Sequence, residues 1–289
     1  MKKNILFTHT DLDGAGCALL LKTFLGLDEI YYISHGLDNK IDNDIKKHLS
    51  KHNPKDVNVF ITDISPNTEE MFEWLIKNCS SVNVLDHHKS QEHFTKYKEF
   101  VYYNGKCGTL LVKEYLQSLG KWEHRYLKDW NYFVEMVNDI DLWILADPFS
   151  KDLNSLFFFM GMAKFVEVFT DKPYMMYRYN DIIDILQKTE EHYVKNVMGQ
   201  KQPCACGGDY VFAEWFGNEV CNELARNNVD HIGVFINMKS KSVSLRSIGD
   251  VDVSVIAKAN GGGGHRNSSG FSFESLEEVD RFIKTGKKK

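Results

Sequence analysis

The first hundred residues alternate between short apolar runs and longer amphipathic or polar segments. Each apolar run has the length of a buried strand, and the runs lie at 4–8, 29–33, 57–62, 81–85 and 100–103. The intervening segments have the length and composition of helices, near 14–25, 40–52 and 65–77. Ser65-Pro66 predicts the N-cap and first residue of the third helix. Strands that alternate with helices indicate a mostly parallel sheet with helices on both faces.

Residues 108–199 have a mainly helical pattern with few turn signals. The predicted helices are 108–119, 128–139, 153–170 and 174–198. After Pro203 and Gly207-Gly208, strands and helices alternate again. The predicted strands are 209–213, 231–237 and 242–247, and the predicted helices are 217–227, 251–259 and 275–285. We therefore expect an α/β domain at 1–145, a helical connector at 146–200 and a smaller α/β domain at 201–289.

The composition is that of a globular protein, and it narrows the range of functions. Of the 289 residues, 43% are hydrophobic and 26% are charged, which suits a folded two-domain chain. The net charge of −5 argues against stable binding of duplex DNA, which requires a basic surface. No signal peptide or membrane span is expected, because no stretch approaches about 18 apolar residues.

The six cysteines do not suggest a disulfide framework in a chain of this length. A reducing cytoplasm is therefore the expected location. Cys204 and Cys206 lack the second pair of ligands that a zinc site needs, so we expect them to lie in a loop.

Acidic and histidine side chains follow three of the predicted strands at the point where each strand ends. In chain order they are His9, Asp11, Asp13, Asp63, Asp86, His87 and His88. The C-terminal ends of parallel strands meet at one edge of a sheet, where ligands bind in such folds. Each group alone could serve as a helix cap, a turn or a solvated loop. Together they predict one metal site.

The residue types indicate which ions this site would take. Mixed carboxylate and imidazole ligands suit Mn²⁺, with Mg²⁺ or Co²⁺ as alternatives. A phosphoester hydrolase with two divalent ions needs one carboxylate shared by both ions and separate ligands for each. With Asp139 and Asp141, near the end of a helical segment, the set is large enough for two ions.

A glycine-rich segment near the C-terminus, at 260–271, is the second candidate functional site. Consecutive glycines let backbone N–H groups approach a phosphate closely, and His265 and Arg266 add donors at the same place. A flexible linker is the alternative, although a linker has no need of His-Arg followed by Ser-Ser-Gly-Phe. Arg246, on the strand upstream, is suited to bidentate contact with a phosphate or to a surface ion pair.

These motifs, in this order, resemble those of the DHH phosphoesterase superfamily. The matching pattern is His-x-Asp-x-Asp-Gly, a lone Asp, Asp-His-His and a later Asp. The glycine run resembles the GGGH-type motif of the DHHA1 domain, which holds substrate in that superfamily. The resemblance covers both ends of the chain, and no motif matches at about 145–200. It implies a DHH domain with a parallel sheet followed by a DHHA1-like domain.

The resemblance also implies roles for single residues. His9 and Asp11 would bind one ion, Asp13 would bind the other, and Asp63 would bridge them. His87 and Asp139 would complete the second ion's ligands. Asp141 is the alternative to Asp139, which is preferred because Trp143 resembles the hydrophobic residue that follows the family's Asp.

The remaining implied roles concern catalysis and substrate. His88 would face the substrate phosphate, and Asp86 would orient the adjacent histidines, so that Asp63, Asp86 and His88 form the catalytic set. The substrate-binding set would be Arg246, Gly262, Gly263, Gly264, His265 and Arg266.

The two-domain layout is closest to the oligoribonuclease or cyclic-nucleotide phosphodiesterase-like group of this superfamily. That implies hydrolysis of short single-stranded oligonucleotides or dinucleotides to mononucleotides, with water activated by two metal ions. The alternatives are a 3′-phosphoadenosine 5′-phosphate phosphatase or a cyclic-dinucleotide phosphodiesterase, and then a non-catalytic nucleotide-binding module. We expect no membrane partner, and a homodimer is left open.

Overall fold

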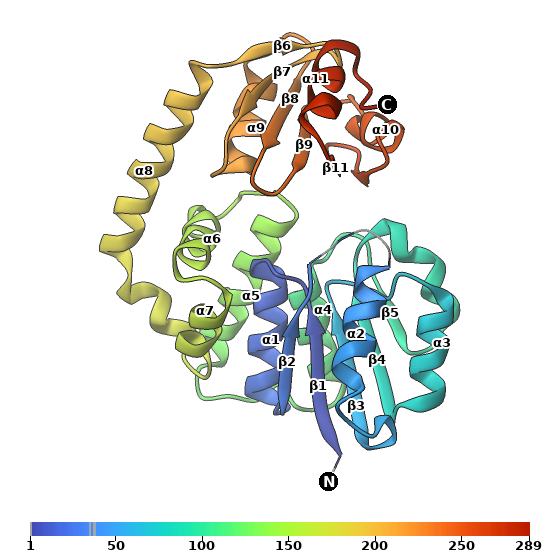
Figure 1. Ribbon diagram of the computed structural model, residues 1–289. Coiled ribbons are helices and arrows are strands. Elements are labelled where there is room, and N and C mark those ends of the chain that lie inside the picture. Colours follow the sequence, from blue (N-terminus) through green and yellow to red (C-terminus); the bar gives the residue numbers. More distant parts are fainter. Residues whose placement is uncertain (1, 35, 37–38) are drawn as a thin grey trace. The chain divides into compact units, whose positions relative to one another are not determined.

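The computed structural model describes residues 2–34, 36 and 39–289. The chain forms two compact units, Met1–Asp184 and Ile185–Lys289, and their boundary falls within helix α8 (Asn180–Met198) (Figure 1). The division into ranges 1–145, 146–200 and 201–289 stays a prediction.

The first unit is built on a five-stranded, all-parallel sheet with the order β2-β1-β3-β4-β5. Its strands are β1 (Lys3–Thr8), β2 (Glu29–Tyr32), β3 (Val57–Thr62), β4 (Ser81–Asp86) and β5 (Phe100–Tyr102). Three of them run side by side in one register, since Thr8 pairs with Thr62 and Thr62 with Leu85. The predicted parallel sheet is confirmed.

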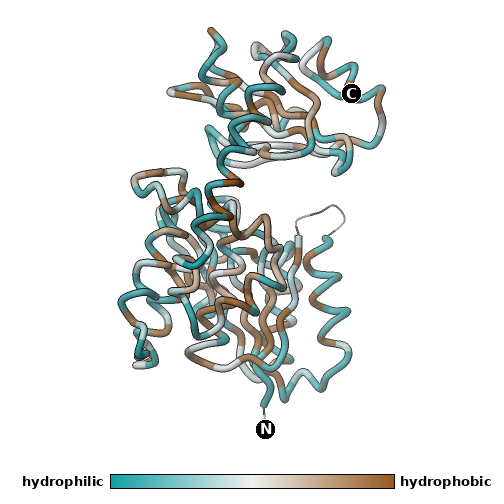
Figure 2. The backbone as a smooth tube through the Cα atoms, turned by 90° about the vertical axis from the view of Figure 1, so that its left-hand side faces the viewer, coloured by the Kyte–Doolittle hydropathy of each residue, from teal (hydrophilic) through white to brown (hydrophobic). Residues whose placement is uncertain are grey.

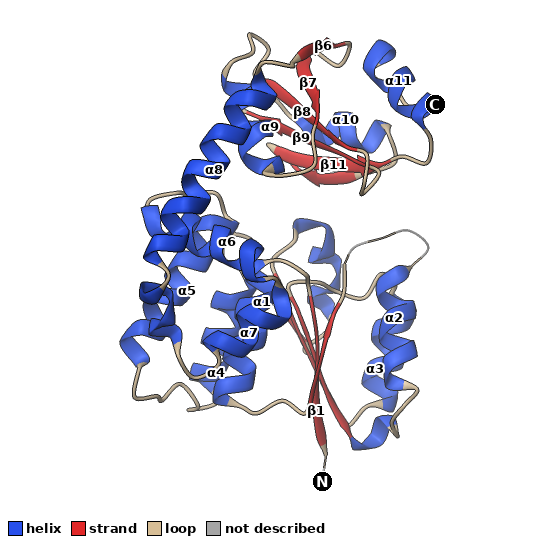
Figure 3. Cartoon of the chain, turned by 60° about the vertical axis from the view of Figure 1, so that its left-hand side comes forward, coloured by secondary structure: helices blue, strands red, loops and turns tan. Residues whose placement is uncertain are grey.

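Helices cover both faces of this sheet, as Figure 3 shows. One layer consists of α1 (Leu12–Phe24), α4 (Gly108–Ser118), α5 (Leu127–Asp141), α6 (Pro148–Met160) and α7 (Met162–Phe169), and the other of α2 (Lys40–Leu49) and α3 (Glu69–Asn78). Alternate residues of each strand face opposite layers: Leu6 and Phe60 pack against the first layer, and Ile5 and Val59 pack against the second. Figure 2 shows how the hydrophobic residues concentrate along these strands.

Several predicted boundaries are corrected. Helix α1 begins at Leu12 with Asp11 as its N-cap, two residues before the predicted start. Helix α3 has Thr68 as its N-cap, whose hydroxyl accepts from Met71 N, so Ser65-Pro66 does not start it. The predicted helix at 153–170 is two helices, because Gly161 has a φ of 71° between them.

The second unit contains a six-stranded mixed sheet with the order β10-β11-β9-β8-β7-β6. The strands are β6 (Gln202–Cys204), β7 (Gly208–Phe212), β8 (Ile232–Asn237), β9 (Ser242–Ser247), β10 (Gly263–His265) and β11 (Ser268–Ser272). Only β7 and β8 pair in parallel. The predicted smaller α/β fold is confirmed, although β6, β10 and β11 were not expected.

Three helices of the second unit and the C-terminal part of α8 pack against this second sheet. The three helices are α9 (Gly217–Arg226), α10 (Val253–Ala259) and α11 (Leu276–Thr285). Val220 and Leu224 of α9 pack with Phe235 on one face, while Val253 of α10 and Phe282 of α11 pack on the other. Short 3-10 helices occur elsewhere at η1 (Pro54–Asp56), η2 (Lys89–Lys96) and η3 (Pro173–Arg178). Within the described ranges, each helix is too short or too polar to cross a lipid bilayer.

Candidate metal centre

The side chains predicted to bind metal gather at the C-terminal edge of the first sheet. There the chain leaves β1, β3 and β4, which lie side by side. Three overlapping groups have ligand atoms within 4.8 Å of one another: His9, Asp11 and Asp63; Asp13, His87 and Asp141; and Asp63, His87 and His88. The structure therefore brings together the residues that the sequence placed at three strand ends.

The first group surrounds His9. Its Nδ1 lies 2.6 Å from Asp11 Oδ2 and 3.7 Å from Asp63 Oδ2. The other oxygen of Asp11 caps α1 by accepting from Gly14 N at 2.9 Å. A Cβ on Gly14 would lie only 2.3 Å from His9 O, so glycine is needed for His9 to lie against the helix. The cap and the glycine thus fix the first group before any ion binds.

The second group surrounds His87. Its Nε2 lies 3.3 Å from Asp63 Oδ1, 3.8 Å from Asp13 Oδ2 and 3.6 Å from Asp141 Oδ2. One oxygen of Asp63 is thus directed toward His9 and the other toward His87. A carboxylate shared between two ions has this arrangement.

Backbone amides at the start of α4 orient Asp13. Gly108 N donates to Oδ2 at 2.6 Å, and Thr109 N donates to Oδ1 at 2.7 Å. The positive end of a helix dipole favours such a carboxylate. A Cβ on Gly108 would approach Asp13 Oδ2 and Asp63 Cβ to 3.0 Å. The sequence did not predict this contact, because the residues at the start of a helix do not show which distant carboxylate their amides will bind.

Asp86 holds His88 in place. Its Oδ1 accepts from His88 N at 3.0 Å and lies 2.7 Å from His88 Nδ1, while its Oδ2 accepts from Ser65 Oγ at 2.5 Å. Burial lowers the pKa of His88, but the bond and charge of Asp86 outweigh burial and raise it to about 9. Asp86 thereby favours the protonated form of the His88 imidazole.

Asp139, the preferred candidate ligand, and Asp141, its alternative, lie in different surroundings. The carboxylate of Asp139 accepts from Ala146 N at 2.9 Å and from Ser150 Oγ at 2.6 Å, so it fixes the loop after α5. Asp141 instead lies in the second group with Asp13 and His87. Asp139 and Asp141 are two residues apart on a helix, so their side chains differ in direction by about 200°. Asp141 therefore faces the candidate metal centre, and Asp139 faces the loop.

The electrostatics of the cluster fit divalent cations. Asp63 is 1% exposed, and its Oδ2 is buried without a hydrogen-bond partner among the described residues. Burial and the negative charges of Asp11 and Asp13 raise the pKa of Asp63 well above its usual range. Burial and the same two neighbours also raise the pKa of Asp141. Bound cations would compensate these crowded charges, and the oxygen and imidazole donors suit Mn²⁺.

In the second unit the predicted glycine loop is a hairpin of β10 and β11. His265 pairs with Ser268, which pairs in turn with Arg246 on β9, so His265 and Arg246 lie two strands apart in register. Arg246 Nη2 donates to Asn218 Oδ1 at 2.5 Å. Arg266, in the hairpin turn, donates to the backbone and carboxylate of Asp250. The predicted substrate-binding residues thus share one end of a sheet.

Two glycines of this hairpin are expected to respond differently to substitution. A Cβ on Gly262 would lie 2.1 Å from Gly270 O and 2.5 Å from Phe271 Cβ, whereas a Cβ on Gly263 would meet nothing within 4 Å. Gly262→Ala should therefore destabilise the second unit by about 1–3 kcal/mol. The matched variant Gly263→Ala should stay within about 0.5 kcal/mol of wild type. Thermal unfolding measures both, and equal losses would contradict the packing described.

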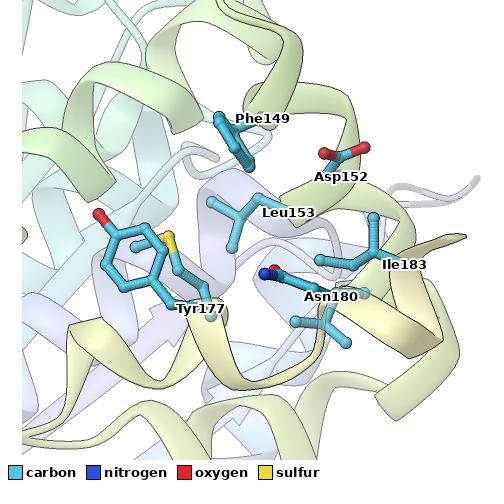
Figure 4. Close-up of a pocket in the computed structure, with 8 residues that line it drawn as sticks. Phe149, Asp152, Leu153, Tyr177, Asn180 and Ile183 are labelled. Carbon is cyan, nitrogen blue, oxygen red and sulfur yellow. The ribbon is translucent and has the colours of Figure 1, made fainter.

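A small cavity in the first unit lies away from the metal centre. Figure 4 shows its lining residues, which come from α6, η3 and the start of α8: Phe149, Asp152, Leu153, Leu156, Met176, Tyr177, Asn180 and Ile183. Its volume of about 10 Å³ suffices for one water molecule. This cavity is too small for a nucleotide.

Comparison with known proteins gives three kinds of match. The DHHA1 domain family matches residues 218–289. Oligoribonuclease NrnB from Bacillus subtilis (strain 168) is 30% identical over 296 aligned positions, which cover 92% of this chain and 72% of that protein.

Two solved structures share the fold. RecJ from Thermus thermophilus, in complex with Mn²⁺, has a TM-score of 0.59 and 14% identity, covering 97% of this chain and 50% of that one. The pGpG-specific phosphodiesterase PggH from Vibrio cholerae has a TM-score of 0.55 and 15% identity, covering 97% and 96%.

Proposed function

Because this chain belongs to the DHH/DHHA1 phosphoesterase superfamily, we propose that it hydrolyses short single-stranded oligonucleotides or dinucleotides to mononucleotides. Membership makes the chain a phosphoester hydrolase and bears out the resemblance found in the sequence. The observation that carries the proposal is the buried carboxylate of Asp63, directed toward two groups of metal-type ligands. The relatives named as an oligoribonuclease and a pGpG-specific phosphodiesterase support this choice of substrate.

The proposed ligands follow the geometry of the groups. His9 and Asp11 would hold one divalent ion, and Asp13, His87 and Asp141 the other, with Asp63 shared. Divalent ions held by these residues would supply a nucleophilic water molecule by lowering its pKa. We assign Asp141 rather than Asp139, since Asp139 already accepts three hydrogen bonds from the 146–150 segment.

His88 is the proposed donor to the substrate phosphate. Asp86 engages Nδ1, so Nε2 is the ring atom that we propose as the donor to a phosphate or leaving-group oxygen. A cationic imidazole at this point stabilises the negative charge that develops on those oxygens. Asp86 would act through His88 by holding its orientation and charge.

The second unit is proposed to bind the phosphates of the substrate. Arg246 and Arg266 provide guanidinium groups, and His265 lies in register with Arg246. The glycine run Gly262, Gly263 and Gly264 stays part of this proposed site, with Gly263 and Gly264 on the strand β10 of the hairpin, whereas Gly262 N already donates to Ala257 O at 2.9 Å. Arginine is suited to this task because its planar fork binds a phosphate with two parallel hydrogen bonds.

The test is product analysis with labelled oligonucleotides of two to five residues, with and without a 5′-phosphate, in the presence of Mn²⁺. Release of mononucleotides from all lengths supports the proposal. Faster release of inorganic phosphate from 3′-phosphoadenosine 5′-phosphate, or ring opening of a cyclic dinucleotide, would favour the alternative enzymes. Tight nucleotide binding without turnover in Mn²⁺ or Co²⁺ would indicate a binding module instead.

Removal of divalent ions is expected to lower the melting temperature. A ligand that binds only the folded state at one hundred times its Kd stabilises it by about 2.7 kcal/mol. Protein treated with EDTA should therefore unfold earlier, and Mn²⁺ should restore the transition in a concentration-dependent way. Differential scanning calorimetry measures the shift. The same transition in EDTA and in Mn²⁺ would exclude an ion-binding centre.

A further inference from the structure

Two cysteine sulfur atoms of the second unit lie in direct contact. Cys206 Sγ is 3.2 Å from Cys204 Sγ, to which it donates a hydrogen bond. Cys204 ends strand β6 and is buried, while Cys206 lies in the β6–β7 turn and is partly exposed. All six cysteines are free thiols, and these two form a dithiol that the metal centre and the hairpin do not use.

The backbone fixes the two cysteines at this distance. Cys204 pairs with Gly208 across β6 and β7, and Gly207 N donates to Cys204 O at 3.0 Å with Gly207 at a φ of 95°. Ala205 N donates to Ile283 O of α11 at 2.9 Å, which anchors the turn from outside. The turn is therefore an ordered part of the sheet, and the sulfur contact belongs to it.

We propose that Cys204 and Cys206 are a redox modification site that forms a reversible intrachain disulfide when exposed to a peroxide or a small-molecule disulfide. A disulfide has an S–S length of about 2.05 Å, so the sulfur atoms must approach by roughly 1.2 Å from their separation of 3.2 Å.

The hydrogen bond within the pair prepares one sulfur for reaction. The S–H of Cys206 lowers the pKa of Cys204 and thereby raises its own pKa. The thiolate is the reactive form of cysteine, so a shared proton of this kind favours exchange and oxidation. Cys17, Cys107 and Cys221 differ, because burial raises the pKa of each thiol.

The reaction balances with hydrogen peroxide as the oxidant. One thiolate attacks a peroxide oxygen, breaks the O–O bond and becomes a sulfenic acid, releasing hydroxide. The second sulfur attacks the sulfenic sulfur and expels its hydroxyl group as water, which forms the S–S bond. The two thiol protons end in two water molecules, and the two electrons lost by the sulfurs reduce the peroxide. With a disulfide oxidant, the two electrons and two protons go to its two thiols.

The geometry favours a reversible bond over a structural one. A ring that closes over three residues removes little entropy from the unfolded chain, so the bond adds little stability. Bonds of this kind are reduced readily by cellular thiols, whereas structural disulfides resist them. A zinc site is disfavoured, because within the described part of the chain no group of metal-type ligands includes either cysteine.

The experiment treats the full-length protein with hydrogen peroxide or glutathione disulfide and then blocks remaining thiols with N-ethylmaleimide. Digestion after lysine, arginine and aromatic residues releases residues 202–210, which separates the pair from Cys221. This peptide should lose the mass of two hydrogen atoms, remain unalkylated, and regain two alkylation sites after treatment with dithiothreitol. The loss should be absent in Cys204→Ser and Cys206→Ser.

Cys79→Ser is the matched control, since Cys79 is also partly buried and lies in the first unit. It should leave the disulfide in the 202–210 peptide unchanged. Four outcomes would overturn the proposal: a peptide that gains oxygen without forming a bond, a bond to Cys221, a bond between two chains on a non-reducing gel, or full alkylation after both oxidants. None of these readouts depends on hydrolytic activity, so they test the dithiol separately from the proposed function.

Discussion

Asp63→Asn is expected to abolish phosphodiester hydrolysis and, at the same time, to raise the melting temperature of the metal-free protein. The carboxylate is directed toward both ligand groups, so its loss removes a ligand from each ion. If this removes about 4 kcal/mol of transition-state stabilisation, the rate falls on the order of 10³-fold. Stability should rise because asparagine keeps the shape but removes a buried carboxyl group that is costly to ionise beside Asp11, Asp13 and Asp141.

The two effects are measured by initial rates in Mn²⁺ and by thermal unfolding in EDTA. Asp28→Asn is the control, since Asp28 accepts from Asn4 N at the opposite, N-terminal end of β1. It should change neither quantity by more than about 0.5 kcal/mol. An Asp63→Asn protein that retains wild-type rates, or that is less stable without metal, would refute the shared-carboxylate assignment.

Asp141→Asn and Asp139→Asn should separate metal binding from loop stability. Asp141 lies in a ligand group, so its substitution should weaken Mn²⁺ binding and hydrolysis by on the order of 100-fold or more, with little loss of stability. Asp139 is 7% exposed and accepts from Ala146 N, Asp147 N and Ser150 Oγ. Its substitution should leave buried donors poorly paired and cost about 1–3 kcal/mol of stability.

Mn²⁺ titration by calorimetry and chemical unfolding in EDTA distinguish the two variants. The structure predicts opposite patterns, with the affinity loss in Asp141→Asn and the stability loss in Asp139→Asn. Affinity lost only in Asp139→Asn would restore the preference based on Trp143 and would require the loop after α5 to rearrange.

The sequence was sufficient to predict the parallel sheet and the gathering of most candidate ligands at its edge. Strands β1, β3 and β4 are largely apolar runs. A parallel sheet places their C-terminal ends at one edge, independently of how the helices pack. His9, Asp63 and His87 follow those ends directly, so their convergence requires no knowledge of tertiary packing.

Other features depend on contacts that no local pattern encodes. Asp139 and Asp141 are the same residue type in the same helix end, so the sequence does not distinguish them. They differ in the structure because the loop at 144–150 folds back and donates hydrogen bonds to Asp139. The amides of Gly108 and Thr109 are joined to Asp13 across about a third of the chain. Strand β10 consists of two glycines and a histidine, which carry no strand signal, and it forms because β11 pairs with it.

The ligands of the centre are fixed by protein contacts that exist without an ion. Gly14 N holds Asp11 and Gly108 N holds Asp13, while Ser65 holds Asp86, which orients His88. These contacts do not involve an ion, and they do not distinguish one divalent ion from another. Affinity for divalent ions then follows their general chemical order, in which zinc and copper bind more tightly than manganese. We therefore expect the metal content of the purified protein to follow the ion supply during expression, and we expect the ions to exchange without refolding of the protein.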